Sequence, residues 1–381
     1  MYIKKIVSFI LVFILICSVT MIKPSALSEK ELTAPSAILI EPTTKKVLFE
    51  HNSHEKRPCA SVTKVMTLLL IMEAIEEGKI TYEEMVTSSQ RASSMGGSDI
   101  WLEEGEQMSV DDMVKAIVVA SANDASVAMA EHICGTEEEF INKMNQRAKE
   151  LGMNDTTFKN CNGLDEDGHL TSAYDVAIMS AELIKHEKIF DYTSIWMDSL
   201  RNGKTQIVNT NKLLKTYKGI TGLKTGTTNE AGCCMSASAT RDGLSLIAVV
   251  LGCKTGTERF KDCATLLDYG FANYKYQLLS SPDEISKEIE VKGGMQKSIE
   301  LSYNINGGFV LPKGSDSSLE YKITLPEYLE APVKKGDKIG KVTYTTGKEE
   351  LASFDIIAKN ETEEINFGSV FNLLYNALIA L

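Results

Sequence analysis

The sequence lacks an excess of positive charge. Its 381 residues include 40 lysines and arginines against 52 aspartates and glutamates, which gives a formal net charge of -12 at pH 7. No block of basic residues interrupts that acidity. General nucleic-acid binding requires a basic surface that neutralises phosphates, so we exclude that class of function and expect no nucleic acid among the partners.

Paired cysteine motifs are also missing. Besides Cys17 there are seven cysteines, an odd number, and no two of them form a C-x-x-C pair. Cys233 and Cys234 would point to opposite faces of a strand, so they cannot easily share a metal ion. His51 and His54 have no evident third ligand. We therefore expect no metal and no cofactor, and we interpret the thiols as buried groups in surroundings with little oxidant.

Length and hydrophobic runs suggest how the chain is divided. A chain of 381 residues, 43% of them hydrophobic, favours two domains with additional segments at the ends. Near the N-terminus, Lys4 and Lys5 precede an apolar stretch at residues 6–19, which is typical of an export signal. We predict a signal peptide over residues 1–26 and an exported, extracytoplasmic protein; a retained membrane anchor is the alternative.

Three short motifs occur in one order along the chain: Ser61-Val62-Thr63-Lys64, Ser121-Ala122-Asn123 and Lys224-Thr225-Gly226. They supply a nucleophile with a nearby amine, a second hydroxyl with an amide, and a cationic strand. This combination suits serine acyl transfer. Each motif alone is a weak signal, and their order and structural setting make the prediction specific.

The first two motifs have similar sequences elsewhere. Ser53-His54-Glu55-Lys56 repeats the first pattern, but a proline two residues later prevents a continuous helix there. The apolar run at residues 65–75 instead predicts a buried helix that begins at Ser61, with Lys64 on the same face. Ser302-Tyr303-Asn304 resembles the second motif, but it lies downstream of the third motif in a region of different composition.

The third motif also occurs twice. Lys254-Thr255-Gly256 follows an apolar run at residues 244–251, where the chain is expected to leave a central strand. Lys224-Thr225-Gly226 precedes a turn at residues 229–232 and a return strand of small residues. We therefore place the earlier copy on an inner strand of a hairpin, where its backbone can pair with an extended peptide.

The surrounding segments favour an α/β (α+β) sandwich, an antiparallel sheet flanked by helices. Residues 36–41 and 46–50 form a predicted hairpin, and helices then dominate. Ser109 and Thr136 each stand three residues before an acidic residue and are predicted helix caps. The second motif is expected on a turn between two helices, from which its side chains can project into a cleft.

The C-terminal third differs in composition. Residues 283–365 consist of short alternating segments broken by glycines, which predicts a small β-rich domain that serves as a spacer or support. Residues 366–381 predict an amphipathic helix, which at about 1.5 Å per residue is too short to cross a hydrocarbon layer of ~30 Å. We expect this tail to lie on a membrane surface; because it has no basic residues, docking on its own domain is the alternative.

From about residue 36 to residue 271 the chain resembles the serine-type D-alanyl-D-alanine carboxypeptidases, which are low-molecular-mass penicillin-binding proteins. The resemblance rests on the three motifs with their flanking residues, on Asn162-Gly163-Leu164-Asp165 leading to His169, and on Glu258-Arg259-Phe260. It implies a DD-peptidase/β-lactamase-like sandwich as a catalytic domain over residues 30–275. In this family His169 resembles a loop residue that is structural or faces the substrate.

The resemblance implies removal of the terminal D-alanine from peptidoglycan pentapeptides during cell-wall synthesis and remodelling. Ser61 would form the acyl-enzyme, with Lys64 as the proton acceptor. Ser121 and Lys224 would relay the proton to the leaving amine, and Asn123 would orient the substrate amide.

It also implies substrate-binding residues and partners. Thr225 and Arg259 are candidates for holding the terminal carboxylate, Gly226 and Thr227 complete the binding strand, and the oxyanion would lie between the backbone N–H groups of Ser61 and Thr227. The expected partners are peptidoglycan stem peptides, β-lactam antibiotics as inhibitors, and a membrane surface bound by the C-terminal tail. The expected location is the cell wall or the outer face of the cytoplasmic membrane, as a peripheral membrane protein.

Two alternative functions stay open at this point. A β-lactamase would use the same motifs but needs an efficient deacylating base, and Glu138 to Asn142, an E-x-x-x-N string, falls inside a predicted helix. A non-hydrolytic penicillin or peptidoglycan sensor would stay acylated. Such sensors usually carry transmembrane signalling segments, and the only candidate is the N-terminal one.

Overall fold

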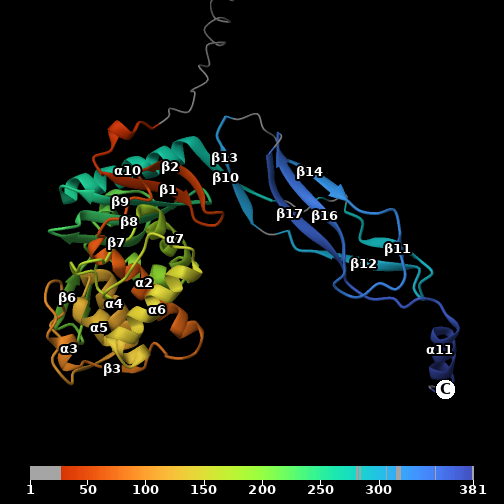
Figure 1. The fold of residues 1–381 in the computed structure, drawn as a ribbon, viewed down its shortest axis with the longest axis horizontal. Coiled ribbons are helices and arrows are strands. Elements are labelled where there is room, and N and C mark those ends of the chain that lie inside the picture. Colours follow the sequence, from red (N-terminus) through yellow and green to blue (C-terminus); the bar gives the residue numbers. More distant parts are fainter. Residues whose placement is uncertain are drawn as a thin grey trace, which may run out of the picture. The chain divides into compact units, whose positions relative to one another are not determined.

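The computed structural model describes residues 27–279, 282, 285–305, 307–314, 319–347 and 349–379. The predicted signal peptide at residues 1–26 lies outside this range. The chain divides into two compact units, Met1–Lys275 and Tyr276–Leu381 (Figure 1). Each unit is described by itself, and the division into functional domains stays a prediction.

An antiparallel five-stranded sheet organises the first unit, with the order β2-β1-β9-β8-β7. The N-terminal hairpin was predicted correctly and pairs with the later strands through β1 and β9. The strand that carries the third motif, β7, lies at the edge of the sheet, so its placement on an inner strand was wrong. The strands are β1 (Ser36–Glu41), β2 (Lys46–His51), β7 (Ile220–Thr228), β8 (Gly232–Arg241) and β9 (Leu244–Cys253).

Helices cover both faces of this sheet, as Figure 1 shows. Helix α10 (Gly256–Asn273) packs against β8 and β9, and α7 (Ala173–Leu183) packs against β9 and β1. Adjacent residues of β9 face opposite sides of the sheet. A Cβ atom on Gly270 of α10 would lie 2.5 Å from Leu246 of β9, and Ile247 of the same strand belongs to the core on the other face. Because both faces are covered, β9 is apolar along almost its whole length.

The other helices surround α2 (Lys64–Glu76), the helix of the first motif. Ten of its thirteen residues are buried, which explains its continuous apolar sequence. The predicted caps are present, since Ser109 accepts a hydrogen bond from the Asp112 N–H and Thr136 from the Glu139 N–H. The remaining helices are η1 (Glu29–Glu31), η2 (Ala60–Thr63), α3 (Gln90–Ser93), α4 (Val110–Lys115), η3 (Ala116–Ala120), α5 (Asn123–Cys134), α6 (Glu137–Glu150), α8 (Ile189–Thr193) and α9 (Leu213–Thr216).

Two small hairpin-like sheets complete the first unit, β3 (Met85–Thr87) with β4 (Gln107–Ser109) and β5 (Met197–Leu200) with β6 (Thr205–Val208). The thiols are distributed through its interior. Cys134 is half-buried, and the other six described cysteines are buried and unpaired.

The second unit is β-rich, as predicted. Its main sheet has the order β14-β16-β17-β12-β11-β15, and β10 (Tyr274–Leu278) pairs with β13 (Gly308–Pro312). Its apolar core includes Ile299, Val342 and Ile356. The main-sheet strands are β11 (Glu288–Lys292), β12 (Ser298–Tyr303), β14 (Leu319–Thr324), β15 (Leu329–Glu330), β16 (Lys338–Thr346) and β17 (Glu349–Ala358).

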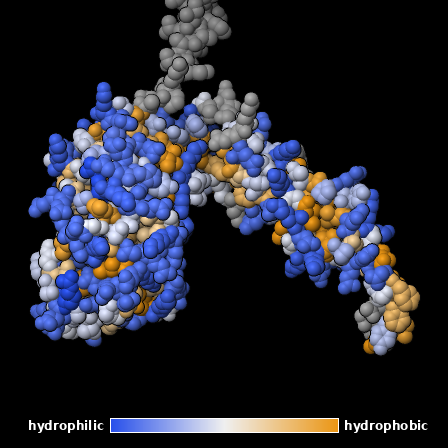
Figure 2. All heavy atoms as spheres, viewed as in Figure 1, coloured by the Kyte–Doolittle hydropathy of each residue, from blue (hydrophilic) through white to orange (hydrophobic). Residues whose placement is uncertain are grey.

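Helix α11 (Phe367–Ile379) ends the described chain. Figure 2 shows hydrophobic side chains on its surface, and Phe367, Phe371 and Leu378 are 87%, 55% and 77% exposed. Among the described residues, no helix has both the length and the apolar character needed to cross a membrane.

Candidate active site

Ser61 lies on the short 3₁₀-helix η2, which continues directly into α2. The sequence predicted an α-helix from Ser61 onward. A 3₁₀ turn instead has three residues per turn, so side chains three residues apart eclipse one another. Accordingly, Lys64 Nζ lies 3.0 Å from Ser61 Oγ.

The Lys64 ammonium nitrogen is completely buried and has two further partners. It lies 2.6 Å from Asn123 Oδ1 and 2.6 Å from the backbone oxygen of Asn162. Burial lowers the pKa of Lys64 to about 7, although the Asp99 and Asp124 carboxylates oppose this shift. A neutral amine has two hydrogens, which these two carbonyl oxygens accept, so its lone pair is left for the Ser61 hydroxyl.

Ser121 lies between η3 and α5, and its backbone is left-handed, with φ +61°. This conformation costs a non-glycine residue about 1–2 kcal/mol. In this conformation the Oγ atom of Ser121 lies 2.9 Å from Lys224 Nζ. Burial, reinforced by the charges of Lys64 and Arg259, holds the pKa of Lys224 well below its usual range. The two lysines therefore each contact one of the two motif serines.

Strand β7 packs directly against the turn that carries Ser61. A Cβ atom on Gly226 would lie 2.8 Å from the Ser61 nitrogen and 2.7 Å from the Cys59 oxygen, so only glycine fits there. Next to it, the Thr225 hydroxyl donates to Thr210 Oγ1 at 2.6 Å. The side chain of Thr227 is exposed at the end of the strand.

Arg259 reaches this strand from α10. Its Nη1 donates to the Gly226 oxygen at 2.8 Å and to Thr227 Oγ1 at 2.9 Å, while its Nε is buried without a partner. Burial lowers the pKa of the Arg259 guanidinium. In this structure Arg259 therefore supports the end of β7.

The loop at residues 157–171 holds α2, the helix of the first motif. Its stretch Asn162–Asp165 and His169 carried part of the family resemblance, but the contact of its backbone with Lys64 was not predicted from the sequence. Besides the Asn162 oxygen on Lys64, the Cys161 oxygen accepts from Thr67 Oγ1 at 2.6 Å. A Cβ atom on Gly163, where φ is +86°, would lie 2.0 Å from the Ala60 oxygen. Backbone oxygens have no sequence signature, so only the glycine could have indicated this close approach.

His169 adds a further attachment of this loop. Its Nδ1 accepts from the Lys159 N–H at 3.1 Å, and its Nε2 lies 2.8 Å from Thr63 Oγ1. Because Nδ1 is an acceptor, Nε2 carries the proton and donates it to Thr63. Burial lowers the pKa of His169 to about 4, so the neutral ring is the stable form.

The similar sequences elsewhere have other structural roles. Ser53 donates to Glu50 at 2.7 Å, Thr255 caps α10, and Ser302 lies on β12 in the second unit.

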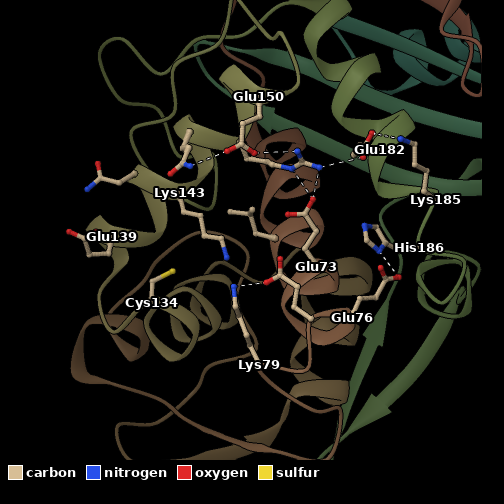
Figure 3. A pocket seen from close by; sticks show the side chains of 15 residues that line it. Glu73, Glu76, Lys79, Cys134, Glu139, Lys143, Glu150, Glu182, Lys185 and His186 are labelled. Carbon is tan, nitrogen blue, oxygen red and sulfur yellow. Dashed lines mark hydrogen bonds and ion pairs between the residues drawn. The ribbon is translucent and has the colours of Figure 1, made fainter. Parts of the chain in front are cut away.

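A pocket of about 1080 Å³ lies at the C-terminal end of α2 and is lined by none of the motif residues (Figure 3). Its charged side chains pair with one another, for example Arg147 with Glu73, Glu150 and Glu182.

The chain is similar to known proteins over most of its length. Residues 23–255 match the family described as D-alanyl-D-alanine carboxypeptidase, and residues 274–364 match the C-terminal domain of penicillin-binding protein 5. The D-alanyl-D-alanine carboxypeptidase DacF of Bacillus subtilis is 45% identical over 344 residues, which cover 89% of this chain and 88% of that protein.

Solved structures are similar over the same regions. Penicillin-binding protein 5 from Haemophilus influenzae superposes with a TM-score of 0.77 and 32% identity, covering 89% of this chain and 100% of that one. Penicillin-binding protein D2 from Listeria monocytogenes, in its ampicillin-bound form, has a TM-score of 0.58 and 32% identity over 63% of this chain and 98% of its own.

Proposed function

Because the chain belongs to the D-alanyl-D-alanine carboxypeptidase family and carries out that family's serine-type reaction, we propose that Ser61 is the residue that becomes acylated. The substrate is the D-Ala-D-Ala end of a peptidoglycan pentapeptide, and the product is the shortened peptide with free D-alanine. The observation that carries this proposal is the set of three contacts of Lys64 Nζ, with Ser61 Oγ, Asn123 Oδ1 and the Asn162 oxygen.

In the first step Ser61 Oγ attacks the carbonyl carbon of the penultimate D-alanine, and the hydroxyl proton passes to Lys64. A pKa of about 7 suits this base at neutral pH. The negative charge that develops on the carbonyl oxygen lies between the backbone N–H groups of Ser61 and Thr227. The close approach of Gly226 to the Ser61 nitrogen supports this placement.

The C–N bond then breaks, and the leaving D-alanine takes a proton through Ser121 and Lys224. The contact of 2.9 Å between these two side chains supports the relay. Thr225 holds the carboxylate of the leaving group. Arg259 contributes its positive charge while it braces Gly226 and Thr227.

The substrate backbone pairs with β7. This strand is the edge of the five-stranded sheet, so one side of its backbone has no partner within that sheet. Asn123 orients the amide of the acyl portion. Water then attacks the ester carbonyl, with Lys64 as the base, and frees the enzyme.

β-Lactam antibiotics react at the same serine. The ring carbonyl meets Ser61 as the peptide carbonyl does, and the ampicillin-bound Listeria relative supports binding of this class of inhibitor. The β-lactamase alternative is not favoured, because Glu138 and Asn142 lie inside the helix α6 and not on a loop that could supply a deacylating base. The sensor alternative is not favoured either, because the relatives are carboxypeptidases.

The reaction takes place outside the cytoplasm, where its substrate is. Residues 1–26 direct export, and α11 binds the membrane surface as a peripheral anchor. Its exposed Phe367, Phe371 and Leu378 support this role. Ring stacking of Phe371 on Phe367 and on Tyr375 keeps these aromatic groups on one face of the helix.

The activity is tested by D-alanine release from a peptide that ends in D-Ala-D-Ala, with Ser61→Ala beside the parent. We expect release by the parent and none by the variant. Ser53→Ala is the matched control, since it removes the serine of the unused S-x-x-K sequence, and it should keep the parental rate. Penicillin labelling of the parent without any D-alanine release would instead support a sensor.

The anchor is tested by sedimentation with vesicles of phosphatidylglycerol and phosphatidylethanolamine. A Phe371→Ser/Leu378→Ser variant should bind these vesicles less than the parent. Met85→Ser, which changes an exposed apolar residue of the first unit, should bind as the parent does. Equal binding by all three proteins would contradict the anchor.

A further inference from the structure

The segment at residues 96–102 lies against the second motif. The Gly96 oxygen accepts from Asn123 Nδ2 at 2.7 Å, and the Ser98 oxygen accepts from the Asn123 N–H at 2.7 Å. A Cβ atom on Gly97 would lie 2.8 Å from Asn123 Nδ2 and 3.7 Å from a methyl group of Leu164. The segment therefore borders the place that we assign to the acyl portion of the substrate.

A buried carboxylate fixes this segment. Asp124 accepts hydrogen bonds from the backbone N–H groups of Ile100 and Leu102 at 3.1 and 3.0 Å, and Arg201 donates to the Ile100 oxygen at 2.9 Å. Ile100 and Leu102 are buried. The side chain of Trp101 between them is directed outward and is 79% exposed, on a backbone with φ +55°.

An exposed tryptophan in a left-handed conformation costs free energy in two ways. Its apolar ring surface stays in water, and its backbone is strained. The hydrogen bonds of Asp124 and Arg201 hold backbone groups of Ile100, Trp101 and Leu102, and none of these bonds involves the indole ring. These bonds hold the backbone, so the exposed ring is the feature that a contact with a bound molecule would account for.

Asp99 stands two residues before Trp101 and is half-buried. Its Oδ1 atom is buried without a hydrogen-bond partner among the described residues. Burial and the neighbouring Asp124 raise the pKa of Asp99, and the Asp124 N–H and Lys64 offset this only in part. A cation that arrives from solution would stabilise the ionised carboxylate.

We propose that residues 96–102 form the subsite for the side chain that precedes D-Ala-D-Ala in the stem peptide, and that this subsite selects a side chain ending in an ammonium group. Asp99 accepts the ammonium, and Trp101 covers the methylene carbons and attracts the cation through its ring. This inference rests on the proposed function, because that function places the acyl portion beside Asn123.

Two peptides test the selectivity on the full chain, Nα-acetyl-L-Lys-D-Ala-D-Ala and its Nα,Nε-diacetyl counterpart. They differ only in the positive charge at the end of the lysine side chain. We expect kcat/KM to be about fivefold higher for the free amine, as for an ion pair at a partly exposed site. Equal values would overturn the proposal.

Asp99→Asn should abolish this preference, because the amide keeps the shape and removes the charge. Asp242→Asn is the matched control, since it removes the same charge from the turn between β8 and β9, and it should keep the parental preference. Penicillin labelling of Ser61 in the Asp99→Asn protein verifies that the active site is intact. A preference that persists in Asp99→Asn would overturn the role of Asp99.

Trp101→Ala should lower kcat/KM about threefold more for the lysine peptide than for Nα-acetyl-L-Ala-D-Ala-D-Ala, because alanine has no long side chain to cover. Trp196→Phe changes the other of the two tryptophans and serves as the control. Equal losses on both peptides would overturn the role of Trp101. D-Alanine release from both lysine peptides at equal rates would leave the carboxypeptidase function standing and remove only this inference, whereas release from neither would remove both.

Discussion

The two units of the chain differ in what they bury. The first buries charged side chains next to specific partners, namely Glu41, Lys64, Lys224, Asp124, Asp175 and Asp262. Within the described residues of the second unit, the buried polar side chains other than Tyr344 are Thr343 and Thr362. Burying a charge costs free energy unless partners compensate it. Such groups persist where a reaction uses them or where they hold the structure together, so we expect the chemistry in the first unit, and a supporting role of the second unit stays a prediction.

The largest effect on activity should follow the removal of one of the buried charges. Lys64→Met keeps most of the side-chain volume but deletes the base, so we expect kcat/KM for D-alanine release to fall roughly 1,000- to 10,000-fold. Lys254→Met in the unused Lys-Thr-Gly copy is the control and should keep the parental value. A Lys64→Met protein with more than a tenth of the parental activity would contradict the assignment of the base.

The close packing around the buried lysine can be tested at Gly163. Gly163→Ala would place a methyl group against the Ala60 oxygen at a positive φ, so we expect a loss of about 3 kcal/mol in the free energy of unfolding, measured with urea. Gly243→Ala has a similar φ of +79° but open space around it, and it should cost about 1 kcal/mol. Equal losses of unfolding free energy in the two variants would mean that the positive φ alone sets the cost at Gly163, and that the contact with the Ala60 oxygen adds nothing.

The ionisation of Lys64 predicts the pH dependence of the activity. Its pKa is lowered to about 7, and the neutral amine is the active form. The value of kcat/KM should therefore rise with pH up to about 7, and it should fall about tenfold for each pH unit below that value. A steady-state profile between pH 5 and 8 measures this, and a flat profile would show that another group accepts the proton.

Stability should also depend on pH through His169. The folded-state pKa of His169 is about 4, below its usual 6.5, so the unfolded chain binds a proton first as the pH falls. The free energy of unfolding should decrease by about 2–3 kcal/mol between pH 6.5 and pH 4, as far as this residue contributes. His169→Gln should show a smaller decrease over this range in thermal unfolding. An identical decrease in parent and variant would assign the effect to other groups.

The smallest effect on activity should follow a change in the second unit. Val342→Ala removes two buried methyl groups from its apolar core and should cost about 2 kcal/mol in the stability of that unit. The kcat/KM value for a short soluble peptide should stay within about twofold of the parent. A large loss of activity in the folded variant would show that the second unit takes part in the chemistry.

Prediction from the sequence succeeded where neighbouring residues determine the geometry. Ser61 and Lys64 are three residues apart, so any helical turn brings their side chains together. The helix caps at Ser109 and Thr136 are local in the same way. The pairing of Ser121 with Lys224 spans 103 residues and was expected only through resemblance to a known family.

Prediction failed or was silent where the position depends on distant segments. The place of β7 at the sheet edge follows from the strand order, which no local pattern records. The backbone oxygen of Asn162 has no residue-type signature, and Asp99 and Trp101 belong to no motif. Their importance follows from the hydrogen bonds of Asp124 and Asn123, which only the folded chain brings into place.

The sequence by itself determined the residue types, the two helical motifs and the β-rich character of the C-terminal unit, because propensity, hydrophobic periodicity and capping act over a few residues. The tertiary structure decided the protonation of the site. The pKa of Lys64 depends on its burial, and its amine is held by oxygens of Asn123 and Asn162, which are 59 and 98 residues away along the chain. Burial of a charge is a property of the whole packed unit, so only the fold lowers the pKa of this lysine to about 7.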